Sequence, residues 1–247
     1  MEAVRIVDVL DATSFDLIPP CADPAFAHRS CDYWEDADRG SKARRAVTPS
    51  PRPATEVRPP ADPAENPFAP KAAGPTFNPF LSELEAQGAI DNPFLPSRAG
   101  RPAPVAPDAP SKLARLSRGL GIFGSYAKVL LVDDEPCAYT QFGPLSAYPR
   151  ALRLRELYPK LPQAPLPAVI TCIATTSRAR GQGLAERLIA EVCRDLGARG
   201  FSAVEAFPEA GAPADSTSSA NPAFWTQVGF HLAASDDRFP VYRRELG

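Results

Sequence analysis

The sequence predicts an α/β (α+β) fold, and three stretches are the basis of that prediction. An uncharged apolar stretch, 168–174, reads as a buried strand, and a helix with apolar residues at helical spacing follows it. Upstream, two apolar runs flank a turn at 133–136, which is typical of a hairpin. A second strand, 201–207, follows the helix. A hairpin joined to a strand–helix–strand unit indicates one mixed sheet flanked by helices.

The remaining segments extend this pattern on both sides. Residues 4–10 alternate and predict a first strand. Residues 111–120 predict a short amphipathic helix capped by Ser111, and Asn221-Pro222 predicts the start of another helix. The central helix begins at Leu184, and Gly197 is its expected stop. Its apolar stripe consists of Leu188, Ile189, Val192 and Leu196.

A basic glycine turn joins the central strand to the central helix. It reads Arg178-Ala179-Arg180-Gly181-Gln182-Gly183. Glycines at a helix start allow backbone N–H groups to approach an anion closely, and the helix dipole and two arginines add positive potential at the same place. The turn therefore predicts a pyrophosphate-binding site.

The turn also resembles the acetyl-CoA-binding signature of the GNAT superfamily of N-acetyltransferases, Arg/Gln-x-x-Gly-x-Gly/Ala. Arg178, Gly181 and Gly183 occupy its fixed positions. The order of segments, down to the short helix ending in Val228-Gly229-Phe230, is similar to the family from its fourth strand onward. The resemblance covers residues 1 to about 42 and 111–247. It implies an acetyltransferase-like, mostly antiparallel central sheet of about six to seven strands flanked by helices.

This resemblance implies an acetyl-CoA-dependent N-acetyltransferase that moves an acetyl group to an unidentified amine acceptor. Acetyl-CoA is then the acyl donor. Backbone N–H groups of 172–174 would hold the acyl carbonyl, and those of 182–184 would hold the pyrophosphate beside the two arginines. The implied donor-binding residues are Cys172, Ile173, Ala174, Arg178, Arg180, Gly181, Gln182, Gly183 and Leu184.

Two other interpretations of the turn compete with this one. The first is a dinucleotide-binding turn, Gly-x-Gly-x-x-Gly, with Glu205 placed to meet a ribose. Against it, Glu186 stands at the third glycine position, and the glycines do not follow the strand directly. The second is a basic turn that binds no ligand.

The candidate general base is Glu205, on the strand 201–207. It shares a strand face with Phe201, Ala203 and Phe207, and an apolar setting raises the pKa of a carboxyl group toward neutrality. The alternative is a glutamate paired with an arginine or solvated. In the following loop, Glu209 and Asp215 are further candidates.

The sequence departs from the family at the general acid, because Trp225 stands where the family usually has tyrosine. An indole N–H does not ionise usefully. This departure supports an alternative function, a non-catalytic or weakly catalytic CoA-binding or docking protein with an acetyltransferase-like fold. Tyr33 and Trp34 lie in a Cys-x-aromatic-Trp-Glu segment similar to one subgroup of the family, and they are candidates for an acceptor pocket or for the core.

Proline divides the chain into an N-terminal part of the acetyltransferase domain, 1–43, an insertion, 44–110, and the remainder of the domain, 111–247. The insertion holds more than half of the 30 prolines together with much alanine, a composition that predicts disorder. Three Asn-Pro-Phe repeats place Phe68, Phe80 and Phe94 along it. Linked weak sites gain effective concentration, so the repeats predict docking of a protein partner, with a plain tether as the alternative.

Composition and cysteine spacing bear on the binding partners, the cellular location and the presence of a metal. A net charge of −2 and a pI of about 5.8 give no signal for nucleic acid or membrane. Five cysteines without regular spacing, and an N-terminus without a secretory pattern, predict a cytoplasmic location. Cys21, His28 and Cys31 fit none of the common zinc spacings, so no metal is expected.

Overall fold

The computed structural model describes residues 3–21, 27–36, 109–211 and 219–247. These residues belong to one compact unit made of Met1–Arg44 and Pro102–Gly247. The predicted insertion lies outside the described residues apart from its last two, 109 and 110, and its boundaries stay a prediction. Phe68, Phe80, Phe94 and Asp215 also lie outside them.

The described residues form seven strands that belong to one sheet. The strands are β1 (Val4–Asp8), β2 (Ala127–Val132), β3 (Glu135–Pro144), β4 (Ala168–Thr175), β5 (Ala203–Ala206), β6 (His231–Ala234) and β7 (Val241–Glu245). The helices are α1 (Ala12–Phe15), α3 (Ser111–Ser117), α4 (Leu120–Phe123), α5 (Pro149–Glu156), α6 (Leu184–Ala198) and α7 (Pro222–Gln227), with short 3₁₀ turns at Leu145–Ala147 and Ser177–Ala179.

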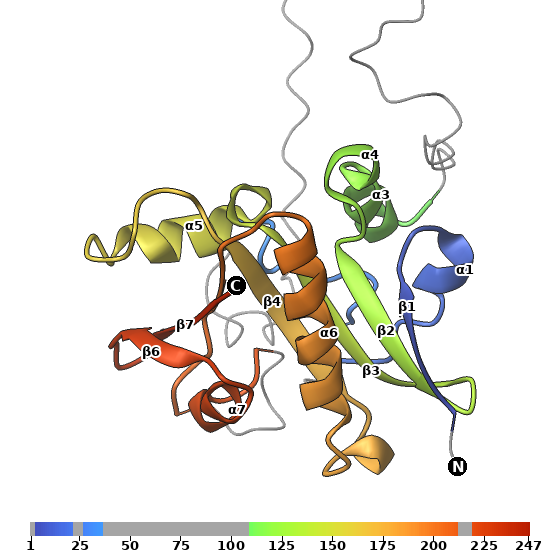
Figure 1. Cartoon of the computed structure of the whole chain (residues 1–247). Coiled ribbons are helices and arrows are strands. Elements are labelled where there is room, and N and C mark those ends of the chain that lie inside the picture. The colour runs from blue at the N-terminus through green and yellow to red at the C-terminus, as the bar shows by residue number, and fades with distance from the viewer. Residues whose placement is uncertain (1–2, 22–26, 37–108, 212–218) are drawn as a thin grey trace, which may run out of the picture. The chain divides into compact units, whose positions relative to one another are not determined.

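The strand order in the sheet is β1-β2-β3-β4-β5-β7-β6. Only β4 and β5 are parallel, and α6 makes the crossover between them (Figure 1). Every other neighbouring pair is antiparallel. The predicted fold class, a mixed and mostly antiparallel sheet flanked by helices, is therefore confirmed.

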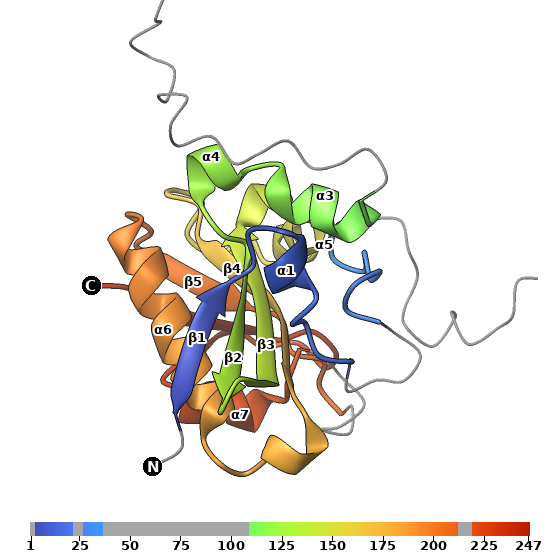
Figure 2. The same ribbon diagram turned by 90° about the vertical axis from the view of Figure 1, so that its right-hand side faces the viewer.

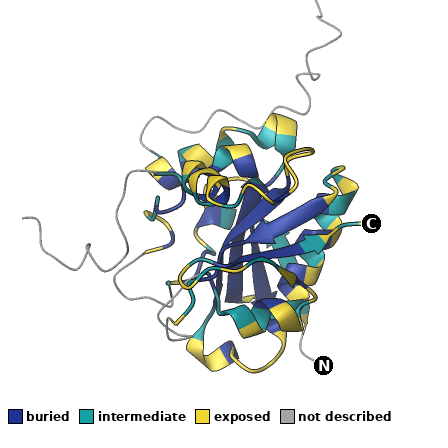
Figure 3. Cartoon of the chain, turned by 90° about the vertical axis from the view of Figure 1, so that its left-hand side faces the viewer, coloured by how far each residue is buried: buried dark blue, intermediate teal, exposed yellow. Residues whose placement is uncertain are grey.

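Helices cover both faces of this sheet, with α6 on one side and α1 and α3 on the other (Figure 2). The α6 side buries Ile189, Val192 and Leu196 against β4 and β5, together with Trp225 of α7. The opposite side buries leucines of α3 against β2 and β3, and Ala151 of α5 lies in a further cluster. Burial is concentrated in the strands, while the outer surfaces of the helices are exposed (Figure 3). The two sheet faces thus have separate cores.

Three local expectations differ from the structure. The hairpin turn is tighter than expected, because Asp133 and Asp134 both take positive φ (49° and 66°) and β3 begins at Glu135, a geometry typical of two-residue hairpins. Helix α6 continues past Gly197, and the left-handed glycine beyond its end is Gly200 (φ 85°). Ser111 is the first residue of α3 rather than its cap. Asn221 does cap α7, accepting a hydrogen bond from the amide of Phe224.

Candidate functional site

Strands β4 and β5 pair over only a short length. Their ladder joins Ala168 to Val204 and ends where Ile170 faces Ala206. Strand β4 continues to Thr175, and on this side its residues 171–175 have no strand partner within the described part of the chain. A bulge lies at this point, because β3 pairs with Cys172 and then with Ile170, skipping Thr171. The split leaves backbone polar groups of β4 available to a ligand.

The glycine turn follows the free end of β4. Gly181 and Gly183 take left-handed backbone conformations (φ 75° and 72°), which an L side chain adopts only with strain. A Cβ at either position would meet no atom within 4 Å, so the space beside the turn is open. Gly183 is the N-cap of α6 and supplies no capping side chain, so the first N–H groups of α6 lack partners from the helix and from a cap. This arrangement fits a phosphate group.

The predicted donor-binding residues occupy this end of β4 and the turn. Cys172, Ile173 and Ala174 are buried in β4, and Leu184 is the buried first residue of α6. The turn residues are exposed, namely Arg178, Arg180, Gly181, Gln182 and Gly183. Arg178 forms an exposed ion pair with Glu135 at 3.1 Å. Together with Arg29, the two turn arginines line a hollow of about 550 Å³ beside the turn.

Glu205 does not lie in the apolar setting that the sequence predicted. Its side chain is fully buried, and it accepts hydrogen bonds from Arg155 Nε (2.9 Å) and Arg243 Nη1 (2.8 Å). Guanidinium N–H donors thus occupy both oxygens: Arg155 donates to Oε2 and, at 3.4 Å, to Oε1, and Arg243 donates to Oε1. Both oxygens are engaged and no solvent reaches them, so the expected apolar setting is wrong and the alternative of an arginine-paired glutamate holds. The role of general base stays a prediction.

The other aromatic and acidic candidates also have structural surroundings. Trp225 is buried, and its indole N–H donates to the carbonyl of Ser219 at 2.9 Å. Tyr33 and Trp34 are both 4% exposed and belong to the core below β4 and β7, so the core interpretation holds for them. Glu209 lies 3.5 Å from Arg238 in a loop.

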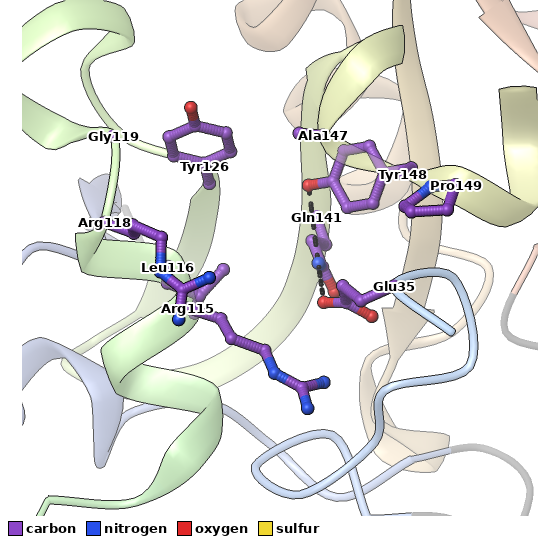
Figure 4. A pocket seen from close by; sticks show the side chains of 10 residues that line it. All are labelled: Glu35, Arg115, Leu116, Arg118, Gly119, Tyr126, Gln141, Ala147, Tyr148 and Pro149. Carbon is purple, nitrogen blue, oxygen red and sulfur yellow. Dashed lines mark hydrogen bonds between the residues drawn. The ribbon is translucent and has the colours of Figure 1, made fainter. Parts of the chain in front are cut away.

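A second group of polar side chains, not predicted from the sequence, lies around a pocket of about 550 Å³ (Figure 4). One wall comes from α3 and the residues after it, with Arg115, Arg118 and Tyr126. The facing wall carries Glu35, Gln141 and Tyr148 (Figure 4). The remaining lining residues are Leu116, Gly119, Ala147 and Pro149.

Glu35 is the centre of a hydrogen-bonded network at this wall. Its Oε1 accepts from Lys112 Nζ and from Gln141 Nε2, the latter at 2.8 Å. Lys112 also donates to Gln141 Oε1 at 2.9 Å, and the Lys112 side chain is only 3% exposed. Tyr148 donates its hydroxyl hydrogen to the carbonyl of Phe142 at 2.7 Å, and burial raises its pKa well above the usual value, so it stays neutral. These hydrogen bonds orient the Glu35 carboxylate at the pocket.

The sheet register connects this pocket to the split in β4. Gln141 faces Cys172 across the antiparallel ladder, and residues directly opposite in such a ladder project to the same face. The pocket wall therefore adjoins the β4 residues that would hold an acyl carbonyl.

Sequence reasoning missed this network because its members are far apart in the chain. Glu35 and Lys112 are 77 positions apart, and Glu35 and Gln141 are 106 apart. One signal was present: Gln141 is a large polar residue inside a mostly apolar stretch, 137–142, and such a residue needs a partner when it is buried.

The described residues show neither a metal cluster nor a membrane span. They contain no group of three or more His, Cys, Asp or Glu side chains that could hold a metal ion. His28 lies against the ring of Tyr139 at 4.8 Å, and its Nδ1 is 2.8 Å from the carbonyl of Pro19. No helix in these ranges has both the length and the apolar character to cross a membrane. All five cysteines are free, and the cytoplasmic location stays a prediction.

Comparison with known proteins finds similarity in structure only. No protein-family model matches the chain, and no curated protein matches it in sequence. Among solved structures, an acetyltransferase from Thermus thermophilus shares 16% identity over 57% of this chain and 78% of its own (TM-score 0.36). A GNAT-family N-acetyltransferase from Escherichia coli, in complex with CoA, shares 20% identity over 54% and 67% (TM-score 0.34). An N-acetyltransferase from Staphylococcus aureus shares 17% over 49% and 67% (TM-score 0.34).

Proposed function

We propose that the chain is an acetyl-CoA-dependent N-acetyltransferase acting on an amine acceptor. One observation carries the proposal: the strand split, the left-handed glycine turn and the uncapped start of α6 all lie at the same end of β4. A ligand with a pyrophosphate at the turn and an acyl group along β4 matches the groups available there. Acetyl-CoA has that form and supplies an activated acetyl group.

On the donor side, the proposal gives each part of the chain a separate task. The N–H groups at 182–184 bind the pyrophosphate, and Arg178 and Arg180 add positive charge beside it. The free edge of β4 at 172–174 binds the pantetheine and holds the acyl oxygen. The bulge at Thr171 changes the direction of the β4 backbone where that oxygen is held.

On the acceptor side, the pocket beside Gln141 supplies the space for an amine. It is lined by residues of α3 and by residues around Pro149, and its Gln141 pairs with Cys172 across the ladder. Glu205 takes no part in this arrangement because its oxygens are held by two arginines.

Titration calorimetry with acetyl-CoA tests the donor site. An Arg180→Glu, Gly183→Glu double variant places negative charge where the phosphates bind, and it should weaken acetyl-CoA binding by more than about tenfold. Arg194→Glu is the matched control, since Arg194 is an exposed arginine further along α6. Equal affinity in the double variant and the wild type would remove the donor site from the turn.

A second candidate function is a CoA-binding or docking protein with little turnover. Trp225 favours it, because this residue is buried, is bonded to Ser219 and offers no acid to a leaving thiolate. Release of free thiol from acetyl-CoA, measured across a panel of amines, peptides and proteins, separates the two functions. Acceptor-dependent release supports the transferase, whereas saturable binding without release supports the second candidate.

We also propose that the chain docks a protein partner, and only the sequence supports this part of the proposal. Phe68, Phe80 and Phe94 lie outside the described residues, so their docking role rests on the repeats alone. A pull-down that compares wild type with a variant carrying alanine at all three positions tests it. Identical recovery of partners would reduce the repeats to a tether.

A further inference from the structure

The charges around the pocket in Figure 4 do not balance. Its charged lining residues are two arginines and one glutamate. The glutamate is already paired with the buried Lys112. The pocket therefore carries excess positive charge, which attracts an anionic group and disfavours a ligand that is only a cation.

Arg118 is the source of that excess. It is exposed, it follows the last turn of α3, and no described residue forms a hydrogen bond or an ion pair with its side chain. Its neighbour Arg115 is 3.8 Å from Asp32, a separation at the long end for an ion pair. A guanidinium group presents several N–H donors in a plane, an arrangement that suits a carboxylate or a phosphate.

The opposite wall presents an acceptor atom instead. Glu35 Oε1 is occupied by Lys112 and Gln141, but Oε2 has no partner within the described part of the chain. The side chain is 13% exposed and lines the pocket. A carboxylate oxygen held in place and open to a cavity accepts a hydrogen bond from an amine N–H.

We infer that the pocket binds the acceptor and selects a small amine that also carries an anionic group. This inference rests on the proposed acetyl transfer. The amine lies at Glu35 Oε2, next to Gln141 and hence to Cys172, and the anionic group lies at Arg118 with Arg115 beside it. The same Glu35 oxygen is placed to take one proton from the ammonium form, which frees the nitrogen lone pair. A pocket of about 550 Å³ has room for a molecule of this kind.

Direct binding of four probes tests this selection without any turnover. Calorimetry with the full chain compares 4-aminobutanoate, O-phosphoethanolamine, butylamine and butanoate. The first two carry both groups, and at least one of them should bind about tenfold or more tightly than butylamine and butanoate. The tighter binder of these two shows whether the pocket prefers a carboxylate or a phosphate as the anionic group. Equal binding of butylamine, or of butanoate, would overturn the inference.

Variants of Arg118 and Glu35 test whether each pocket wall contributes to probe binding. Arg118→Gln should weaken the better probe by about tenfold and Arg118→Glu by more, since the latter adds repulsion. Arg194→Gln on α6 is the matched control and should leave binding unchanged. Glu35→Gln should weaken the amine-bearing probe while leaving butanoate unaffected. If that variant unfolds, the exposed Arg118 still decides the question. Wild-type affinity in Arg118→Glu would overturn the inference.

Failure of the inference and failure of the proposed function give different results. Thiol release with butylamine as rapid as with the bifunctional probes keeps acetyl transfer and overturns the inference. Binding of a bifunctional probe that depends on Arg118, together with no binding of acetyl-CoA, keeps the pocket assignment and removes the transferase.

Discussion

Two carboxylates that are paired with cations, Glu205 on β5 and the partly buried Glu35 in the segment 27–36, lie in opposite situations. Glu205 is fully buried, and guanidinium groups from Arg155 and Arg243 occupy both of its oxygens. Glu35 is also paired with a cation, Lys112, but one of its oxygens faces a pocket. Both residues are thus paired with a cation, and this pairing alone does not distinguish a structural carboxylate from a functional one. The separating feature is an acceptor atom left free at a cavity.

The largest effect on stability is expected for Glu205→Gln. The substitution removes the charge shared by two buried guanidinium groups, and breaking a buried pair in this way destabilises a protein by about 3–5 kcal/mol. Arg155 is the more affected partner, because Arg243 keeps its bonds to Glu245. Urea unfolding measures the change, with Glu209→Gln as the neighbouring control. A loss under about 1 kcal/mol would contradict the closed pair.

Acetyl-CoA affinity should be unchanged in the folded fraction of Glu205→Gln. A variant that kept its stability but lost turnover would restore Glu205 as the proton acceptor and reverse the comparison.

The second largest effect is expected for Glu35→Gln. Unlike Glu205→Gln, this substitution should weaken ligand binding as well as lower stability. The glutamine keeps hydrogen-bonding capacity toward Lys112, and Lys112 retains its bond to Gln141, so we expect a loss of only about 1–3 kcal/mol. Binding of the amine-bearing probe should fall by about tenfold, while acetyl-CoA binding stays as in the wild type. Calorimetry measures the change in probe affinity, and urea unfolding of the same preparation measures the change in stability. Glu156→Gln, an exposed carboxylate on α5, is the control.

These two glutamates also show what the sequence can and cannot predict. The strand, glycine turn and helix around Gly183 are consecutive in the chain, so their pattern predicted these elements, and the donor-binding residues assigned to them stay a prediction. Glu205 was correctly placed on a strand, but its partners come from α5 and β7, and neither is implied by the local pattern. The pocket around Glu35 needed three distant segments to meet, and periodicity carries no information about such meetings.

A smaller and pH-dependent effect is expected at Asp195, which resembles Glu205 in that both of its oxygens accept hydrogen bonds or ion pairs. Burial opposes ionisation of Asp195, but hydrogen bonds from Arg199 and Lys128 outweigh it, so its pKa is lowered below the usual 3.8. A lowered folded-state pKa stabilises the fold above the unfolded value, and this stabilisation is lost as the pH falls through the folded value. Asp195→Asn should therefore destabilise the protein at neutral pH, with a difference that shrinks below about pH 3.8.

Urea midpoints of wild type and Asp195→Asn, measured from pH 7 downward, check this expectation. A difference that stays constant into the acid range would mean that the two cations do not favour the ionised form of Asp195.

The smallest effect is expected for Glu135→Gln at the exposed pair with Arg178. Both side chains are more than half exposed, and such pairs contribute less than about 1 kcal/mol. Stability should hardly change. Acetyl-CoA affinity should rise slightly, because Arg178 is released from its carboxylate and its charge acts on the phosphates. Calorimetry at low and high salt measures the change, which should vanish at high salt.

The sequence separations across the Glu35 network have a consequence for the order in which the two halves of the site assemble. The donor turn is built from neighbouring residues and forms as soon as β4 and α6 do. The pocket wall requires Glu35 to meet Lys112, 77 positions away, and Gln141, 106 positions away. Such non-local contacts form late, because the entropy cost of closing a long loop must be overcome first. A partly folded chain would then carry the turn without the pocket. In hydrogen exchange under mild denaturant, the amides of α3 should open before those of α6.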